Sequence, residues 1–174
     1  MPMNPPTPRL LWSLLAAGSI ALVAGSFVLT AWFNLHPCHL CIFQRLLFMK
    51  LSVLFLLAAW WSPRPAAAWA GLLSLPISAL GIAVAAYQSW LQVQPPGSIS
   101  CMAGEPGLIE RLVEWLVEWL GQLQPDLFLA TGFCEEAELS ILGLSLANWA
   151  LVSFTAFFGA SVWALLRGRK VHVR

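Results

Sequence analysis

Charged residues are scarce in this 174-residue chain, where they make up 10% of the sequence. An ordinary soluble domain carries about 25%, and hydrophobic residues here make up 59%. This balance excludes an ordinary soluble domain and indicates a protein embedded in a lipid bilayer. A net charge of +1 also excludes the strongly basic surface on which nucleic acids bind, so we expect no nucleic-acid partner.

Acidic residues are absent from most of the chain, since all eight lie between Glu105 and Glu138. Four apolar stretches reach the length needed to cross a bilayer, about 20 residues. They run over about residues 10–33, 42–61, 66–90 and 142–166. The length allows one domain, so the sequence predicts an all-α integral membrane protein. Its single membrane domain, residues 1–174, is expected to be a four-transmembrane-helix bundle.

The first apolar stretch lies where a secretory signal peptide would be found. Its apolar run exceeds the roughly 7–15 residues of a signal core, and no small-residue cleavage site follows it. We therefore expect this stretch to be retained as a transmembrane helix.

Basic residues predict which side of the membrane each loop faces, because short cytoplasmic flanks are rich in Lys and Arg. Arg9, Arg64 and the four basic residues of the tail fall on one side if the chain crosses four times. We expect that side, with both termini, to be cytoplasmic. Residues 34–41 and 91–141 are then outer loops, and they contain all four cysteines. In an oxidising compartment an even number of cysteines indicates disulfides.

The second outer loop contains an amphipathic pattern over residues 107–121. Its charged side chains share an arc of roughly 100° on a helical wheel: Glu110, Arg111, Glu114 and Glu118. Apolar side chains occupy the other side: Leu108, Leu112, Trp115, Leu116 and Trp119. We expect a short interfacial amphipathic helix with the two tryptophans at headgroup depth. A helix packed on a soluble subdomain is the alternative.

Cys38 and Cys41 form a Cys-x-x-Cys motif at the expected start of the second span. The backbone dipole of a helix N-terminus favours a thiolate, so this pair can form a reactive disulfide. A structural disulfide is the alternative, although a loop this small gains little entropic stabilisation. A zinc site would want a second close cysteine pair or a histidine pair, and haem attachment would need His directly after Cys41. We therefore expect thiol–disulfide chemistry and no metal ion.

Arg45 lies one turn beyond Cys41 on the same helix face, with Gln44 beside it. An arginine at the centre of a membrane costs about 2.5–3.5 kcal/mol, and less near the interface. An anionic partner would offset that cost, such as the Cys41 thiolate or a cofactor oxygen. The alternative is an arginine that reaches headgroup phosphates. Lys50 falls on the opposite side of the helix, so we do not assign it to the same site.

Cys101 and Cys134 form a second pair, and both stand in loop-like sequence contexts. A disulfide between them could be purely structural. A second pair beside a reactive first pair could instead pass electrons onward, because a thiolate attacks a disulfide and exchanges with it. The residues alone leave both readings open.

These features together resemble the disulfide bond formation protein B (DsbB) family of bacterial inner membranes. The resemblance is carried by residues 37–45, which read PCHLCIFQR, by Gly132-Phe133-Cys134-Glu135, and by residues 142–145, which read LGLS, with Trp149. The four-span layout matches over nearly the whole chain. A histidine that family members can carry near the end of the third span is missing here.

The resemblance implies a quinone-dependent thiol oxidase, which is a protein-disulfide oxidoreductase. Its expected partners are a periplasmic DsbA-like thioredoxin-fold protein, which it reoxidises, and a membrane quinone, either ubiquinone or menaquinone. The resemblance implies that Cys101 forms the mixed disulfide with the protein partner, and that Cys134 is its disulfide mate and attacks Cys38. It also implies that Cys41 meets the quinone and that Arg45 belongs to the quinone site. Gln44 is a further candidate there.

Two other functions remain possible from the sequence. A vitamin K epoxide reductase-like protein also combines four helices, a Cys-x-x-Cys motif and loop cysteines with a quinone-type ring. In that family the motif lies late in the chain, whereas here it opens the second span. A non-enzymatic membrane scaffold with two structural disulfides is the other alternative.

Overall fold

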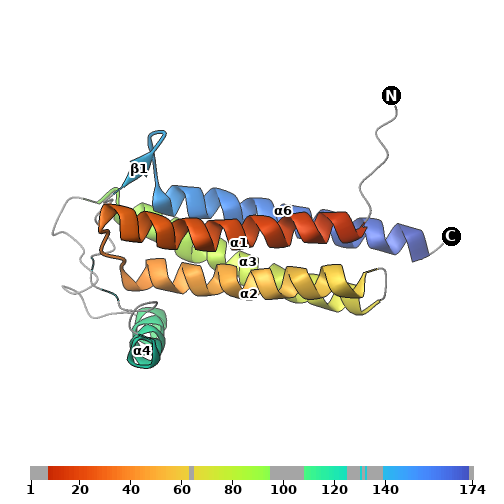
Figure 1. The fold of residues 1–174 in the computed structure, drawn as a ribbon, viewed down its shortest axis with the longest axis horizontal. Coiled ribbons are helices and arrows are strands. Elements are labelled where there is room, and N and C mark those ends of the chain that lie inside the picture. Colours follow the sequence, from red (N-terminus) through yellow and green to blue (C-terminus); the bar gives the residue numbers. More distant parts are fainter. Residues whose placement is uncertain are drawn as a thin grey trace.

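The computed structural model describes residues 8–62, 65–94, 108–124, 130, 132 and 139–172. Four long helices run side by side: α1 (Pro8–Phe33), α2 (His39–Trp61), α3 (Ala66–Leu91) and α6 (Leu146–His172). In the described part of the chain, α1, α2, α3 and residues 146–167 of α6 are long and apolar enough to cross a membrane. The predicted four-helix membrane bundle is therefore confirmed (Figure 1).

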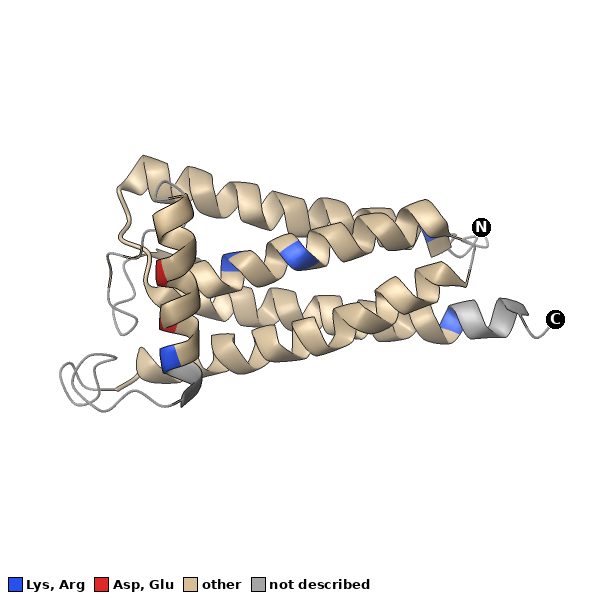
Figure 2. Ribbon diagram, turned by 90° about the horizontal axis from the view of Figure 1, so that it is seen from below, with Lys and Arg blue, Asp and Glu red and all other residues tan. Residues whose placement is uncertain are grey.

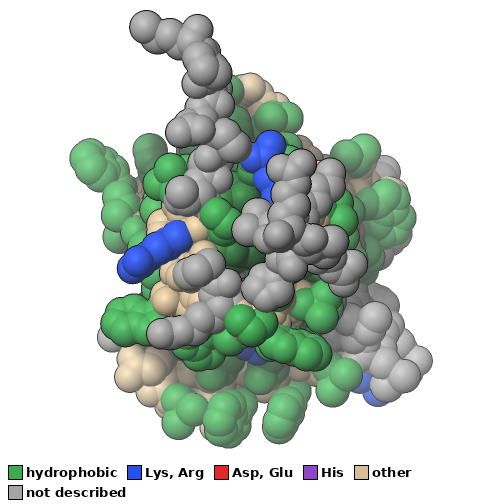
Figure 3. All heavy atoms as spheres, turned by 90° about the vertical axis from the view of Figure 1, so that its right-hand side faces the viewer, with side chains coloured by type: hydrophobic (Ala, Val, Ile, Leu, Met, Phe, Trp, Pro, Cys, Tyr) green, Lys and Arg blue, Asp and Glu red, His purple; other side chains and the backbone are tan. Residues whose placement is uncertain are grey.

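The four long helices alternate in direction, so successive connecting segments lie at opposite ends of the bundle (Figure 1). The start of α1 and the end of α6 lie at one end, which Figure 3 views directly, and hydrophobic side chains lie around basic ones there. The other end carries α4 (Leu108–Leu123) and the two short strands β1 (Ser140–Ile141) and β2 (Leu144–Ser145). Cys38 and Cys41 lie at this second end, at the start of α2.

Exposed tryptophans lie at two levels along the bundle. Trp32 and Trp90 are exposed near the cysteine end, and Trp60 and Trp69 are exposed near the opposite end. In α3 the two are 21 positions apart, which is about 32 Å at 1.5 Å per residue. The hydrocarbon core of a bilayer is about 30 Å thick and tryptophans gather at both of its faces. The bundle therefore has the length and the aromatic borders of a membrane domain.

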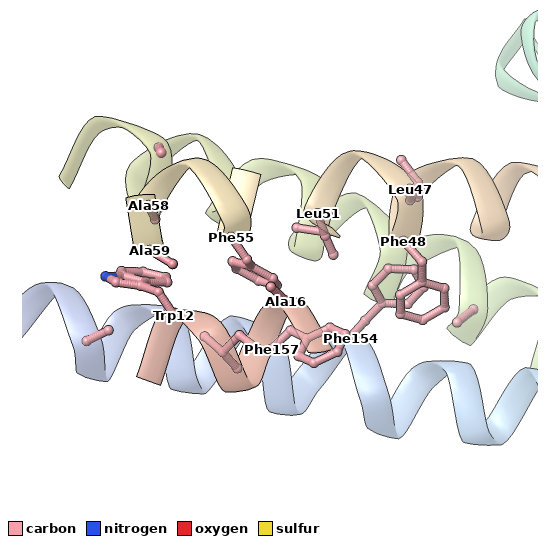
Figure 4. Packing of buried hydrophobic residues seen from close by; sticks show 14 residues of the cluster. Trp12, Ala16, Leu47, Phe48, Leu51, Phe55, Ala58, Ala59, Phe154 and Phe157 are labelled. Atoms are coloured by element: carbon pink, nitrogen blue, oxygen red, sulfur yellow. The ribbon is translucent and has the colours of Figure 1, made fainter. Parts of the chain in front are cut away.

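The bundle core holds stacked aromatic rings (Figure 4). Phe48 of α2 and Phe154 of α6 stack with ring centroids 4.0 Å apart. Gly81 of α3 allows this close approach, because a Cβ atom there would lie 2.4 Å from the Phe154 ring. Buried serines add hydrogen bonds, as where Ser52 Oγ donates to Ser19 Oγ at 3.0 Å between α2 and α1. Small residues and hydroxyls of this kind hold helices together in lipid.

The fourth helix begins later than the sequence indicated. Residues 142–166 were expected to be helical, but α6 starts at Leu146 and residues 140–145 form a β-hairpin in which Ser140 pairs with Ser145. The hairpin turn has φ of 55° at Leu142 and 79° at Gly143. Positive φ at both central positions is typical of a type I′ turn and is incompatible with a right-handed helix. The prediction was wrong here because Leu142, an apolar residue within the turn, extended the apolar run that was taken for the helix.

The expected amphipathic helix is present as α4, and it crosses the end of the bundle (Figures 1 and 2). Val113 and Val117 are buried against the cysteine end, whereas Trp115 and Trp119 are exposed. The apolar side is therefore divided between two surroundings rather than forming the single face that the wheel suggested. One apolar stripe packs on the bundle and the other points away from it.

Candidate functional site

Cys38 and Cys41 are held together by the start of α2, where the sequence placed them. Cys38 is the N-cap residue, and its Sγ accepts the backbone N–H of Cys41 at 3.4 Å. The two Sγ atoms lie 3.0 Å apart. Cys38 is buried and Cys41 is half-buried. The unpaired N–H groups of a helix start favour negative charge, so this position favours a thiolate on the less buried of the two, Cys41.

Two glutamines form a hydrogen-bonded chain that ends at these sulfurs. Gln44 Nε2 of α2 donates to Gln88 Oε1 of α3 at 2.8 Å. Gln88 Nε2 in turn lies 3.0 Å from Cys41 Sγ and 3.5 Å from Cys38 Sγ. The sequence did not single out Gln88. The available signal was a polar side chain in the last turn of an otherwise apolar span, level with the Cys-x-x-Cys motif.

Arg45 is held by α1, which the sequence could not reveal. Its Nη2 donates to the Ser26 backbone oxygen at 3.3 Å and to the Thr30 hydroxyl. The guanidinium also lies 5.0 Å from the centre of the Phe27 ring. Its hydrogen-bond acceptors in the described structure are thus neutral, although it also interacts electrostatically with Cys41 and Cys38. Among the described residues, the Cys41 and Cys38 sulfurs correspond to the expected anionic partner.

Thr30 is in place to receive Arg45 because of the way α1 ends. The Leu35 N–H bonds to the Thr30 carbonyl at 3.1 Å, and Asn34 between them has φ of 47°. This is a Schellman ending, in which asparagine takes the left-handed position more readily than most residues. The Thr30 hydroxyl donates to the Ser26 carbonyl at 2.8 Å, so it presents its lone pairs to Arg45.

A cavity of about 360 Å³ lies beside the cysteines. The polar side chains that line it include Cys38, Cys41, Gln44, Arg45 and Gln88. Its other walls come mainly from small and apolar residues of α1 and α6: Ala21, Leu22, Gly25, Leu29, Ala147 and Ala150. Cavities of about 300–1,000 Å³ with a few convergent polar groups are typical small-molecule sites. Lys50 does not line this cavity and is exposed, in agreement with its expected position away from Cys41.

The hairpin before α6 covers part of this cavity. Ile141 lines it, and the Ile141 carbonyl accepts a hydrogen bond from Trp149 Nε1 at 3.0 Å. Ser145 Oγ accepts the Asn148 N–H at 3.3 Å, which caps the start of α6. Of the sequence features noted here, Trp149 lines the cavity, and residues 142–145 form the turn and strand that pair with Ile141.

Gly132 lies against the chain that enters the Cys-x-x-Cys motif. Its backbone N–H bonds to the Pro37 carbonyl at 3.3 Å. A Cβ atom at Gly132 would lie 1.7 Å from the His36 carbonyl oxygen, so no other residue fits without a backbone shift. Gly132 precedes Cys134 by two residues. Cys134 and Cys101 themselves lie outside the described residues.

Comparison with known proteins gives consistent matches over the chain. The profile of the family described as disulfide bond formation protein DsbB matches residues 8–164. The chain is 39% identical over 159 residues to Disulfide bond formation protein B of Dechloromonas aromatica (strain RCB), covering 91% of this chain and 93% of that protein. It is 37% identical to the protein of that name from Azoarcus sp. (strain BH72), covering 87% of each chain. A third relative, from Verminephrobacter eiseniae (strain EF01-2), is 36% identical over 163 residues.

Proposed function

Because this chain belongs to the disulfide bond formation protein B family and has the helices of a multi-pass membrane protein, we propose that it is a quinone-dependent thiol oxidase. Its substrates are a reduced DsbA-like thioredoxin-fold protein and a membrane quinone. The observation that carries the proposal is that Cys41 and Arg45 line one cavity with largely apolar remaining walls. Family membership leaves the vitamin K epoxide reductase-like alternative without support.

The cavity residues fit a quinone. Arg45 and Gln44 would hold its ring oxygens, because an arginine carries five N–H donors and an amide two. The two described hydrogen bonds of Arg45 both use Nη2, which leaves donors on its other nitrogens for a ligand. The apolar α1 and α6 walls suit an isoprenoid chain. A bound quinone supplies an acceptor for two electrons and two protons.

The cysteines act as a relay of disulfide exchanges. A partner thiolate attacks Cys101 in a Cys101–Cys134 disulfide, which forms a mixed disulfide and releases Cys134 as a thiolate. Cys134 then attacks Cys38 in the Cys38–Cys41 disulfide, which releases Cys41 as a thiolate beside the cavity. The second partner thiol resolves the mixed disulfide, Cys101 recovers Cys134, and Cys38 is left reduced. In sum the partner loses two electrons and two protons, and Cys38 and Cys41 hold those electrons.

The helix start and Arg45 prepare Cys41 for the last step. The helix dipole and the guanidinium both favour negative charge on its sulfur, and the cavity lies directly beside it. Loss of two electrons restores the Cys38–Cys41 disulfide. Gly132 supports the exchange between pairs, because it holds the sequence just before Cys134 against Pro37.

The proposal includes an orientation in the bacterial inner membrane. Arg9 is the second residue of α1 and Arg167 lies in the last part of α6. The start of α1 and the end of α6 lie at the end of the bundle opposite the cysteines (Figure 1). Basic flanks mark the cytoplasmic side. The termini are then cytoplasmic and the cysteine end faces the periplasm.

The test is a quinone-reduction assay with the purified, detergent-solubilised protein and a reduced DsbA-like protein. Ubiquinone and menaquinone analogues are supplied in separate reactions, and their reduction is followed by ultraviolet absorbance. The proposal expects the absorbance change to match the amount of partner oxidised. A mass-shifting thiol reagent, added during turnover, should label cysteines of both pairs. Cysteines that stay fully oxidised, with no quinone reduced, would support the membrane-scaffold alternative.

A further inference from the structure

The hydrogen bond between Gln44 and Gln88 determines which end of the Gln88 amide, the oxygen or the nitrogen, faces the cysteine sulfurs. Gln88 Oε1 accepts a hydrogen bond from Gln44 Nε2 at 2.8 Å. A carboxamide has its oxygen and its nitrogen on opposite sides, so the Gln88 nitrogen faces the other way. It faces Cys41 Sγ at 3.0 Å and Cys38 Sγ at 3.5 Å. The sulfurs therefore meet an N–H donor rather than a carbonyl acceptor.

Burial strengthens this arrangement. Gln44 is 5% exposed and Gln88 is 3% exposed, so little water competes for their amide groups. Buried polar groups that keep their partners are stronger in a low dielectric, and rotation of the amide would leave groups unpaired. The two residues come from different helices and are 44 positions apart, so the packing of α2 on α3 fixes the geometry of this hydrogen-bonded glutamine pair.

An N–H donor acts differently on the two redox states of the cysteine pair. A thiolate is a stronger acceptor than a thiol or a disulfide sulfur, and hydrogen bonds to a charged group are about twice as strong as neutral ones. A donor at this position therefore favours the reduced pair with Cys41 as thiolate. A reduced form stabilised in this way makes a disulfide a stronger oxidant.

We propose that Gln44 and Gln88 are positioning residues for the redox pair, in which Gln44 fixes the Gln88 amide so that its N–H groups stabilise the Cys41 thiolate. The idea deepens the proposed function and rests on Cys38 and Cys41 being its redox pair. Arg45 is the charged side chain that acts on the same sulfurs. Gln88 adds a neutral donor from α3, which the charge on α2 does not replace.

The competing explanation is that the glutamines only join α2 to α3. A reduction equilibrium separates the two explanations. The full chain carrying Cys101→Ser and Cys134→Ser leaves one titrating pair. Dithiothreitol gives two electrons to the Cys38–Cys41 disulfide and becomes a cyclic disulfide. Of its two protons, one goes to the Cys38 thiol and one to solvent, which leaves Cys41 as the thiolate.

Gln88→Met in this background should lower the equilibrium constant for reduction about tenfold, which corresponds to about 30 mV for a two-electron couple. Gln44→Met should lower it less, about threefold, because the Gln88 donor remains but is no longer held. Adding Gln44→Met to Gln88→Met should change nothing further, since without quinone Gln44 acts on the sulfurs only through Gln88. Ser89→Ala is the matched control, because Ser89 bonds only to the Ala85 carbonyl of its own helix in the described contacts.

An unchanged equilibrium constant in a folded Gln88→Met protein would overturn the proposal, as would additive effects of the two substitutions. If Gln88→Met does not fold, the Gln44→Met result decides, and no shift there overturns the proposal. The rate of Cys41 alkylation by iodoacetamide should fall in parallel. Neither quinone nor partner is present, so a null result here leaves quinone reduction by the unaltered protein as a separate question.

Discussion

Gly132 donates its backbone N–H to the Pro37 carbonyl oxygen across 3.3 Å, directly before the Cys-x-x-Cys motif. The contact is so close that a Cβ atom at Gly132 would overlap the His36 carbonyl. Two segments separated by almost a hundred positions in the sequence thus meet backbone to backbone. One leads into Cys38 and the other into Cys134.

Gly132→Ala should slow electron transfer between the two cysteine pairs. The added methyl group must push the segment away from His36, and misplacement of reacting groups by about 1 Å can cost on the order of 100-fold in rate. Partner-driven quinone reduction should therefore fall about 10- to 100-fold. Reduction of the quinone by dithiothreitol, which can act on Cys38–Cys41 directly, should be retained. Gly159→Ala is the control, because its Cβ would meet nothing within 4 Å; equal partner-driven rates in the two variants would contradict the prediction.

Cys41→Ser should abolish quinone reduction. Formation of the Cys38–Cys41 disulfide releases the two electrons, and a serine hydroxyl cannot form it. The mixed disulfide between Cys101 and the partner should still form. Non-reducing gel electrophoresis checks the mixed disulfide, and ultraviolet absorbance checks the quinone. Residual quinone reduction would show that another cysteine contacts the acceptor.

Arg45→Ala should weaken quinone use while leaving the bundle folded. Loss of a charged donor typically costs about 1.5–3 kcal/mol, so kcat/KM for quinone should fall about 10- to 100-fold. Thr30→Val keeps the charge but removes an acceptor that orients it, so a smaller loss of about threefold is expected. Quinone titrations at saturating partner measure both. Failure of Arg45→Ala to insert into the membrane would instead indicate that the arginine anchors the helix.

Gly81→Ala should destabilise the bundle, because its Cβ would lie 2.4 Å from the Phe154 ring. Overpacking of a tight core costs about 1–3 kcal/mol. Unfolding by increasing SDS in mixed micelles measures the loss of stability. Adding Phe154→Leu should recover part of it by making room, so a double variant less stable than both single variants would refute this packing.

The main architecture could be predicted from the sequence because lipid imposes a simple rule. Every spanning segment must be apolar and about 20 residues long. The apolar runs ended near Phe33, Trp61 and Trp90, within one residue of the ends of α1, α2 and α3. The fourth span was placed four residues too early because its hairpin is as apolar as a helix. Only the positive φ at Leu142 and Gly143 separates the two, and a leucine gives no warning of it.

The candidate site was predicted in part. Cys38, Cys41, Gln44 and Arg45 share the first turns of one helix, so helical periodicity brought them together. Gln88 was missed because its role depends on how α3 packs against α2. The acceptors of Arg45 were missed for the same reason, since they lie on α1. Helical periodicity describes the faces of one helix at a time, whereas these contacts depend on how two helices are aligned along the bundle axis.

Thr30 links the end of α1 to the position of Arg45 on α2. Its carbonyl closes the last turn of α1, and its hydroxyl receives the guanidinium of Arg45 from α2. The point at which the first helix stops therefore sets the height at which a charge stands in the second. An insertion or deletion of one residue within the last turns of α1 would rotate Thr30 by about 100°. The length of α1 is therefore constrained by the site, because a change in that length would move the group that accepts the Arg45 hydrogen bond.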